Sequence, residues 1–319
     1  MALLEVKGLR TYFKTQEGTL KAVDGVDFTV EKGHAMGLAG ESGCGKTTAA
    51  LSIMKLLPAN GYIAGGKINF MGQDMARVTG EKLRAIRWRD ISIVFQGAMN
   101  ALNPVKRVGD QIAEPILLHE DVDDEVAMKR VKELFELVGI SPNRIRDYPH
   151  EFSGGMRQRV MIAMALACKP RLVIADEPTT ALDVMIQAQI LQLMKSLQQE
   201  LELAMIIISH DLSVLAETCE TLCIMYAGKI VERADSVEVF RNPQHPYTKG
   251  LIGAFPNIKG DKTMPASISG NPPNLIEAPE GCRFADRCYM AKEICSKEEP
   301  PLIGVRPNHF AACHFVKGV

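Results

Sequence analysis

The chain has 319 residues, a length that favours two domains, or one large domain with appendages, over a single core. Its formal net charge is −1, so no basic field indicates nucleic acid as a partner and no polybasic segment indicates a membrane anchor. The N-terminus lacks a signal-peptide pattern and no apolar run approaches membrane-spanning length, so we expect a cytoplasmic protein that does not itself cross a bilayer.

Residues 3–33 alternate apolar and polar side chains in short runs around turns at Gly18 and Gly33. This alternation predicts antiparallel strands, because successive side chains of a strand point to opposite faces. Tyr12 and Phe13 in this segment offer rings on which a nucleotide base could stack. Two adjacent aromatic residues in a strand belong more often to a core, so both interpretations stay open at this point.

Residues 40–47 have the sequence Gly-Glu-Ser-Gly-Cys-Gly-Lys-Thr, which is a complete G-x-x-x-x-G-K-[ST] phosphate loop. An apolar run at 34–39 predicts a buried strand before it, and a helical pattern that extends to Pro58 follows it. Glycines here let backbone N–H groups point at phosphate oxygens, beside the positive end of the helix dipole. An ordinary glycine-rich turn would not require Lys followed by Thr, so we expect a nucleotide site.

Within the loop, Lys46 is expected to reach the β- and γ-phosphates, and the Thr47 hydroxyl to take one magnesium position. Thr48 can add a further phosphate contact. The expected nucleotide ligands of the loop are Ser42, Gly43, Cys44, Gly45, Lys46, Thr47 and Thr48.

The apolar run 91–95 predicts a strand that ends at Gln96. A Gln in that position can reach a magnesium ion or an attacking water, or it can be a solvated loop amide. From Val108 to Ala167 the periodicity is helical, with Val131, Leu134, Phe135 and Val138 on one stripe, which predicts an inserted helical lobe.

Ser153, Gly154 and Gly155 begin a helix inside this lobe, and Ser153 is a good N-cap. Exposed amides and a hydroxyl at a helix N-terminus form an anion site, here free to face the nucleotide of another subunit. The simpler interpretation is a cap followed by two flexible glycines.

The apolar run 172–175 is typical of a fully buried parallel strand, and it places Asp176 and Glu177 at its carboxyl end. Beside a bound triphosphate, Asp176 would hold magnesium through water and Glu177 would polarise the water that attacks the γ-phosphorus. A solvated acidic turn is the alternative, and it fits less well once a phosphate loop is present.

A long amphipathic helix is predicted next, with Ile190, Met194, Leu197 and Leu201 on one face. The apolar run 204–208 then predicts a strand that leads to His210, where a γ-phosphate sensor would lie. A hairpin at 221–232 is expected to close the domain, and Cys219 and Cys223 are expected to pack in a helix and a strand.

Near residue 240 prolines become frequent, which predicts an irregular appendix. Four of the eight cysteines lie there, at Cys282, Cys288, Cys295 and Cys313. Disulfides are disfavoured in a reducing cytosol, and the spacing lacks the close pairs usual for zinc without excluding a Cys₄ site. A four-thiolate iron–sulfur cluster tolerates varied spacings, so the residues alone leave zinc and iron–sulfur open.

With these motifs in order, the chain resembles an ABC-transporter ATP-binding subunit over residues 3 to about 240. The phosphate loop, Gln96, residues 153–158, residues 172–177, residues 181–183 and His210 match the Walker A, Q-loop, signature, Walker B, D-loop and switch-histidine motifs of that family. The tail resembles the dipeptide/oligopeptide importer branch, on residues 242–249 (Asn-Pro-Gln-His-Pro-Tyr-Thr-Lys), residues 270–273 and the four cysteines.

The resemblance implies an α/β P-loop NTPase fold of the ABC ATPase type, with an antiparallel β subdomain, an inserted helical subdomain and an irregular Cys-rich C-terminal extension. It implies an ATP-binding domain at 1–240, a helical subdomain at about 97–168 and the extension at 241–319. Phe13, or failing that Tyr12, would stack on adenine, and Asp183 would belong to the D-loop near the nucleotide. The resemblance also favours a [4Fe–4S] cluster over zinc on the four cysteines, as a structural group remote from the ATP chemistry.

The function that the resemblance implies is ATP hydrolysis, with ATP and Mg²⁺, coupled to uptake of dipeptides or oligopeptides. The subunit would lie on the cytoplasmic face of a prokaryotic cell membrane with two transmembrane permease subunits, resting near residues 96–104. A second ATP-binding subunit, a related chain or a copy of this one, and an extracytoplasmic solute-binding protein would complete the importer. Residues 97–102 depart from the usual pattern of the branch, and some members are assigned to oligosaccharides. A soluble, non-transport ABC ATPase is a further alternative.

Overall fold

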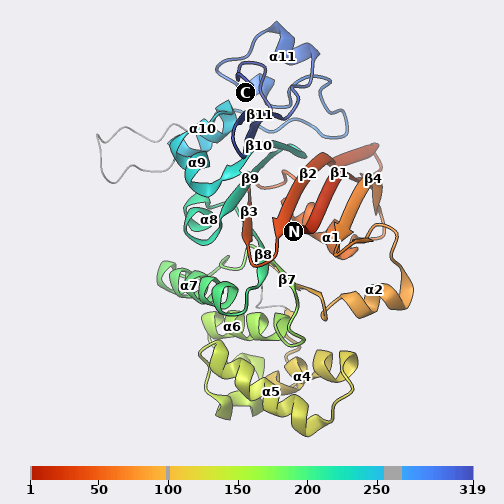
Figure 1. Ribbon diagram of the computed structural model, residues 1–319, viewed down its shortest axis with the longest axis vertical. Coiled ribbons are helices and arrows are strands. Elements are labelled where there is room, and N and C mark those ends of the chain that lie inside the picture. The colour runs from red at the N-terminus through yellow and green to blue at the C-terminus, as the bar shows by residue number, and fades with distance from the viewer. Residues whose placement is uncertain (1, 98–100, 255–267, 319) are drawn as a thin grey trace. The chain divides into compact units, whose positions relative to one another are not determined.

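The structure, a computed structural model, describes residues 2–97, 101–254 and 268–318 (Figure 1). Its contacts divide the chain into two compact units. The first unit comprises residues 30–35 and 77–209 with the N-terminal residues up to Leu3, and the second comprises residues 4–29, 36–76 and those from His210 onwards.

An antiparallel sheet in the second unit is formed by the N-terminal part of the chain, as expected. Its strands are β1 (Ala2–Lys14), β2 (Thr19–Glu31), β4 (Gly61–Phe70) and β5 (Gln73–Asp74), in the order β2-β1-β4-β5. β1 pairs with β4 in a register that places Leu4 opposite Phe70, and both side chains are buried. The alternating burial along β2 shows why the sequence alternates apolar and polar residues there.

Parallel pairing of β3 (Ala35–Ala39) with β9 (Thr221–Tyr226) positions the start of the phosphate loop in the second unit. The loop leads into α1 (Lys46–Met54). This helix ends earlier than the sequence predicted, because Lys55 takes a left-handed conformation with φ of 52° and closes the last turn. Leu56 and Leu57 therefore lie outside the helix.

The predicted hairpin is β9 with β10 (Lys229–Asp235), and the C-terminal extension continues from it. β12 (His309–Ala311) pairs antiparallel with β10, and β11 (Ile303–Arg306) pairs with β12. The predicted appendix therefore adds strands to β10 besides its irregular segments. α8 (Leu212–Thr218) precedes β9, and α9 (Ser236–Arg241) follows β10. The described helices of the extension are α10 (Pro246–Gly253), the 3-10 helix Ala285–Arg287 and α11 (Glu293–Lys297).

A buried carboxylate anchors the extension to β10. Oε1 of Glu232 lies 2.7 Å from Nε2 of His309, and both side chains are fully buried. The same carboxylate accepts hydrogen bonds from the backbone N–H groups of Gln244 and His245, at 2.7 and 2.8 Å. One side chain thus joins β10, β12 and the segment before α10, which orders a part of the chain that has few apolar residues of its own.

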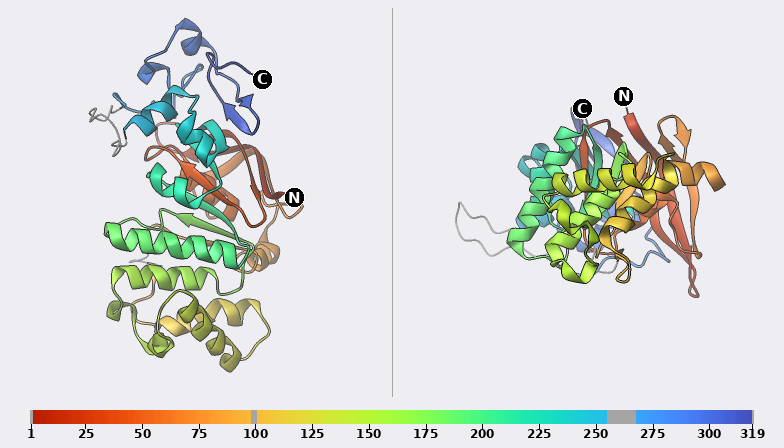
Figure 2. Two further views of the ribbon diagram at one scale, coloured as in Figure 1. Left: turned by 60° about the vertical axis from the view of Figure 1, so that its left-hand side comes forward. Right: turned by 90° about the horizontal axis from the view of Figure 1, so that it is seen from below.

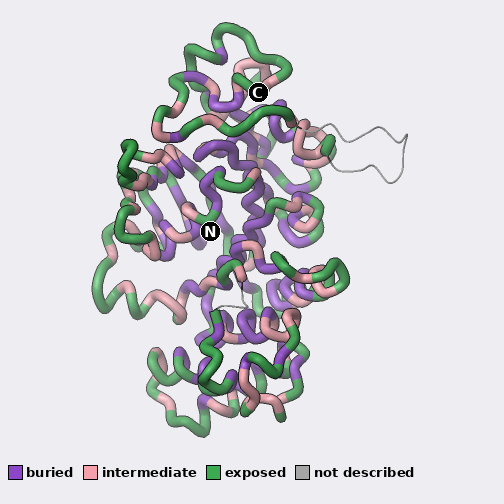
Figure 3. Tube along the Cα trace, turned by 180° about the vertical axis from the view of Figure 1, so that it is seen from behind, coloured by how far each residue is buried: buried purple, intermediate pink, exposed green. Residues whose placement is uncertain are grey.

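Three parallel strands form the core of the first unit. β7 (Leu172–Asp176) pairs with β6 (Ile91–Val94) on one side and with β8 (Ala204–Ser209) on the other. Every residue of β7 and β8 is buried, as expected for strands covered on both faces (Figure 3). This pairing brings the carboxyl ends of β6 and β7 to the same edge.

The helices of the first unit include the predicted helical lobe. They are α2 (Gly80–Ile86), α4 (Val108–His119), α5 (Asp124–Leu137), the 3-10 turns Pro142–Arg146 and Pro149–Glu151, α6 (Gly154–Ala165) and α7 (Val184–Glu200). The predicted stripe of Val131, Leu134, Phe135 and Val138 is buried. Leu201 is 48% exposed, so its predicted place on the buried face of α7 is wrong, because that helix ends at Glu200.

α6 and α7 lie side by side (Figures 1 and 2). Glycine at position 155 permits this approach, since a Cβ there would lie 2.6 Å from Cγ2 of Ile186. Within the part of the chain that the structure describes, no helix is both long and apolar enough to span a membrane.

Candidate functional site

The phosphate loop depends on glycines that no other residue could replace without displacing the backbone. Gly40 has φ of +147°, and a Cβ on it would lie 2.1 Å from the carbonyl oxygen of Met225. Gly45 has φ of +107°, and its Cβ would lie 2.3 Å from the carbonyl oxygen of Ala22. Contacts with β2 and β9 therefore fix the path of the loop.

Lys46 is held by the loop itself. Its side chain is buried, and its Nζ donates hydrogen bonds to the carbonyl oxygens of Gly40 and Glu41, at 2.8 and 2.9 Å. Gly45, the N-cap of α1, has no side chain to accept hydrogen bonds from the first turn of the helix. The loop therefore combines a fixed ammonium with a helix N-terminus, an arrangement that suits phosphate oxygens.

Glu41 is a residue of the loop that the sequence analysis did not single out. Its backbone N–H donates to the hydroxyl of Tyr247 at 2.9 Å, and its carboxylate pairs with Arg287 at 2.7 Å. Arg287 belongs to the cysteine-containing extension. The extension therefore contacts the phosphate loop through Arg287, while the expectation that the four cysteines lie remote from the ATP chemistry stays a prediction.

In the first unit, Gln96 and Glu177 lie together. β6 ends at Val94, so Phe95 is not part of the predicted strand, and Gln96 follows just beyond the sheet edge. Its Nε2 donates to Oε2 of Glu177 at 2.7 Å, and the Thr180 hydroxyl donates to the same oxygen at 2.9 Å. Thr180 is a partner that the sequence analysis missed. The parallel pairing of β6 with β7 brings these residues together.

Asp176 and Glu177 differ in their surroundings although they are adjacent. Asp176 is the last residue of β7 and is 3% exposed. Glu177 has φ of 46°, a left-handed conformation that is uncommon for a residue with a side chain. The strand therefore ends between them, and the Glu177 carboxylate accepts a hydrogen bond from Gln96. Such conformations occur often at functional sites.

Ser153 and Asp183 both cap helices. Ser153 is exposed, and its hydroxyl accepts from the backbone N–H of Met156 at 3.4 Å, as its predicted N-cap role requires. Asp183 caps α7 by accepting from the backbone N–H of Ile186 at 2.9 Å, a role that the sequence analysis missed. The Asx-then-helix pattern could have revealed this cap.

His210 is exposed and directly follows Ser209, the last residue of β8, as predicted. The next residue, Asp211, caps α8 by accepting from the backbone N–H of Ser213 at 2.9 Å. His210 thus lies in a short connection between a buried strand and a capped helix.

The two aromatic candidates for base stacking have different environments. The Tyr12 hydroxyl donates to Oδ1 of Asp24 at 2.7 Å, and burial together with this bond raises the pKa of Tyr12 to about 12. Phe13 lies against Gly61, where a Cβ would come within 2.8 Å of its ring. Tyr12 is therefore occupied by a structural contact, and Phe13 stays the predicted stacking residue.

All four cysteines of the extension line one small cavity, together with side chains that include His245, Phe284 and Phe315. Burial raises the pKa of the Cys282 thiol to about 11, and it also raises the pKa values of Cys288 and Cys313. Within residues 2–97, 101–254 and 268–318, no three His, Cys, Asp or Glu side chains surround a point that could hold a single metal ion.

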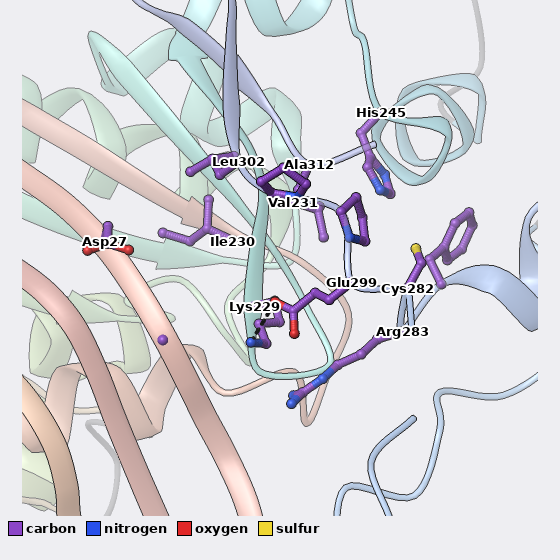
Figure 4. Close-up of a pocket in the computed structure, with 14 residues that line it drawn as sticks. Asp27, Lys229, Ile230, Val231, His245, Cys282, Arg283, Glu299, Leu302 and Ala312 are labelled. Atoms are coloured by element: carbon purple, nitrogen blue, oxygen red, sulfur yellow. Dashed lines mark ion pairs between the residues drawn. The ribbon is translucent and has the colours of Figure 1, made fainter. Parts of the chain in front are cut away.

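Figure 4 shows a neighbouring cavity of about 170 Å³ between β10 and the extension. Lys229 and Glu299 form an ion pair of 2.7 Å across it. Arg283 extends away from the Cys282 thiol and pairs with Asp24. None of the predicted nucleotide-binding residues lines this cavity, so we assign it no part in nucleotide binding.

Comparison with known proteins agrees with this geometry. The ABC transporter family matches residues 23–180, and the family described as the oligopeptide/dipeptide transporter C-terminal region matches residues 231–295. The oligopeptide transport ATP-binding protein OppD of Bacillus subtilis is 47% identical, over 97% of this chain and 87% of its own length. The dipeptide transport ATP-binding protein DppD of the same species is 46% identical, over 98% of this chain and 94% of its own length.

Among solved structures, the dimeric ATP-binding cassette MJ0796 in a post-hydrolysis state, bound to ADP and Pi, superposes with a TM-score of 0.66. It is 26% identical and covers 73% of this chain and 98% of its own. CbiO1 from Clostridium perfringens gives a TM-score of 0.65 at 26% identity, over 76% of this chain and 91% of its own. The chain therefore belongs to the ABC transporter family, as an ATP-hydrolysing ATP-binding subunit that carries the oligopeptide/dipeptide transporter C-terminal region.

Proposed function

We propose that this subunit powers the import of dipeptides or oligopeptides. The observation that carries the proposal is the match of residues 231–295 to the oligopeptide/dipeptide transporter C-terminal region, in a chain with a complete phosphate loop. The subunit acts at the cytoplasmic face of the cell membrane, beside two transmembrane permease subunits that receive solute from an extracytoplasmic binding protein. Residues 1–240 form the ATP-binding domain, with a helical subdomain at about 97–168, and residues 241–319 form the extension.

Each nucleotide ligand has a separate role. Lys46 supplies a positive charge to the β- and γ-phosphates, and the amides of residues 42–48 surround them. Thr47, Gln96 and Asp176 hold Mg²⁺ directly or through water. The support for these roles is the loop that fixes the Lys46 ammonium and the sheet edge that presents Gln96 beside Glu177.

Glu177 polarises the water that attacks the γ-phosphorus, and His210 senses the γ-phosphate. The hydrogen bonds from Gln96 and Thr180 orient the Glu177 carboxylate for this task. Phe13 stacks on adenine.

Two ATP-binding subunits, this chain with a related one or with a copy of itself, close head to tail around ATP. The N-terminus of α6, with Ser153, Gly154 and Gly155, then binds the γ-phosphate held by the other subunit. Asp183 keeps the start of α7 in place nearby. The permeases rest near residues 96–104, of which Ala98, Met99 and Asn100 lie outside the described residues.

Cys282, Cys288, Cys295 and Cys313 hold a [4Fe–4S] cluster, with a zinc ion as the alternative. The four thiols line one cavity, and this shared lining supports a common ligand set. A single zinc ion needs its ligands to converge on one point, whereas each thiolate of a [4Fe–4S] cluster binds a different iron atom. The likeness of the extension to the oligopeptide/dipeptide transporter C-terminal region favours the cluster. It would supply a cross-link where few apolar side chains form a core.

Metal analysis separates these alternatives. The full chain, purified without oxygen, should be brown and contain about four iron and four sulfide ions. Colourless protein with one zinc ion per chain would show that the same four cysteines bind zinc instead of the cluster. Protein without either metal would reject both assignments.

Identification of the proteins that copurify from detergent-solubilised membranes tests the transport function. Two permeases should be recovered, and ATP hydrolysis by the complex should rise when a peptide-loaded binding protein is added. If an oligosaccharide-loaded binding protein stimulates ATP hydrolysis instead, the transported solute is an oligosaccharide. Recovery of ribosomes or DNA without permeases would indicate a soluble ABC ATPase.

A further inference from the structure

Glu41 of the phosphate loop is held at its backbone and its side chain by the C-terminal part of the chain. Its N–H donates to the Tyr247 hydroxyl at 2.9 Å. Nη1 and Nη2 of Arg287 donate to the two carboxylate oxygens, at 2.7 and 3.0 Å. This is a bidentate pair, a geometry that fixes position as well as charge.

Arg287 is itself tightly placed. Its side chain is 6% exposed, and its Nε donates to the carbonyl oxygen of Ser269 at 2.9 Å. Nη1 also donates to the hydroxyl of Tyr226 at 3.3 Å. Arginine is not deprotonated in proteins, so this buried guanidinium carries a full charge. Its planar fork holds the Glu41 carboxylate in a fixed geometry.

The residues that hold Glu41 are continuous with the wall of the cysteine cavity. Arg287 directly precedes Cys288, and its backbone N–H donates to the carbonyl oxygen of Phe284 at 3.1 Å. Phe284 lines the cavity and packs edge-on against Tyr226 and Tyr247, with ring centroids 5.2 and 5.3 Å away. The order of the cysteine segment therefore sets the positions of Arg287 and Tyr247.

We propose that Arg287 is a positioning residue for the phosphate loop, acting through Glu41, and that the ordered cysteine segment thereby raises the affinity for ATP. The carbonyl oxygens of Gly40 and Glu41 hold the Lys46 ammonium. If Glu41 moves, this support moves with it, and the loop must be reordered when the nucleotide binds. The inference rests on the proposed role of the loop in binding phosphate.

The test is ATP binding and steady-state hydrolysis by the full chain, purified without oxygen. Arg287→Ala should weaken ATP binding about tenfold, the range of a lost hydrogen-bonded ion pair, and raise KM more than it lowers kcat. Glu41→Gln, which leaves the extension unchanged, should weaken binding in the same direction. Arg287→Lys should recover only part of the loss, because an ammonium cannot form the fork.

The matched control is Arg306→Ala, which removes another ion pair of the same extension, to Glu238 at 3.4 Å, without touching the loop. It should bind ATP as the wild type does. The exchange Glu41→Arg with Arg287→Glu should restore part of the affinity that either single change removes. Cys288→Ser should weaken ATP binding as Arg287→Ala does, and it should add little to that variant because both act through one contact.

Lys46→Ala, measured in parallel, separates the phosphate-binding role of the loop from the positioning role of Arg287. If Lys46→Ala binds ATP normally, the proposed phosphate role fails. If Lys46→Ala loses ATP while Glu41→Gln and Arg287→Ala retain wild-type affinity, the positioning role of Arg287 is overturned and the proposed function stands. Should Arg287→Ala fail to fold, Glu41→Gln decides the outcome alone.

Discussion

Gln96 and Glu177 are joined by a hydrogen bond of 2.7 Å between the amide nitrogen and Oε2 of the carboxylate. The two residues are 81 positions apart in the chain and meet because β6 and β7 pair in parallel. An amide that donates to a carboxylate fixes the direction of that side chain. Gln96 thus holds the Glu177 carboxylate in one orientation.

Glu177→Gln should abolish most hydrolysis while ATP binding survives. The variant keeps the size of the side chain but loses the basic oxygen, and loss of a positioned general base costs about 10²–10⁴-fold in rate. An ATP-bound dimer should then accumulate, detectable by gel filtration with ATP. Glu202→Gln, an exposed carboxylate paired with Lys32, serves as the control. Wild-type hydrolysis by Glu177→Gln in the assembled complex would reject the assignment.

Lys46→Ala should weaken nucleotide binding itself, because the phosphates lose a direct positive charge. Since hydrogen bonds to charged groups contribute about 1.5–3 kcal/mol, we expect roughly 10- to 100-fold weaker binding of ATP in a fluorescence titration. Lys32→Ala removes an exposed lysine elsewhere and should have no effect. Normal affinity of the Lys46 variant would count against the phosphate-loop interpretation.

Ser153→Arg tests whether α6 acts on the nucleotide of another subunit. The variant should bind ATP as a monomer but fail to pair, because a bulky cation would take the place of the γ-phosphate. Sedimentation with ATP measures the pairing. Ser141→Arg is the control. Ser141 is the N-cap of a 3-10 turn, and its side chain forms no capping hydrogen bond. If the Ser153→Arg monomer cannot bind ATP, the helical lobe is misfolded. The variant then gives no support for binding of α6 to the nucleotide of another subunit.

Asp24 should make the free energy of unfolding depend on pH in the acidic range. Burial opposes its ionisation, but the hydrogen bond from Tyr12 and the charges of Lys229 and Arg283 prevail and lower its pKa below 3.8. A lowered carboxyl pKa stabilises the folded state above the unfolded-state pKa, and this contribution is lost as pH falls through the folded-state value. The urea midpoint of Asp24→Asn should therefore be lower at pH 7 and fall less steeply below about pH 4 than the wild-type midpoint.

Asp121→Asn, a change at an exposed carboxyl, provides the comparison for that experiment. Its midpoint should follow the wild type across the whole pH range. Parallel curves for Asp24→Asn and the wild type would show that the ion pairs of Asp24 contribute nothing to acid sensitivity.

The sequence by itself determined the fold class, the family and the order of the motifs, because each of these depends on local patterns. Continuous apolar runs predicted β7 and β8, and alternation predicted β1 and β2. The phosphate loop was evident since its chemistry requires glycines and a lysine at fixed spacing. The catalytic and magnesium roles of Glu177, His210 and Asp176 stay predictions that the variants above address.

Tertiary structure alone decided which distant side chains meet. Arg287 and Glu41 are 246 residues apart, and no spacing or periodicity connects them. Thr180 and Gln96 both donate to Oε2 of Glu177, a residue with a left-handed backbone conformation. Tyr247 and Arg287 of the extension both contact Glu41 of the loop, and no sequence pattern predicted these contacts. Periodicity reports which face of one element is buried, whereas such contacts depend on how several elements pack together.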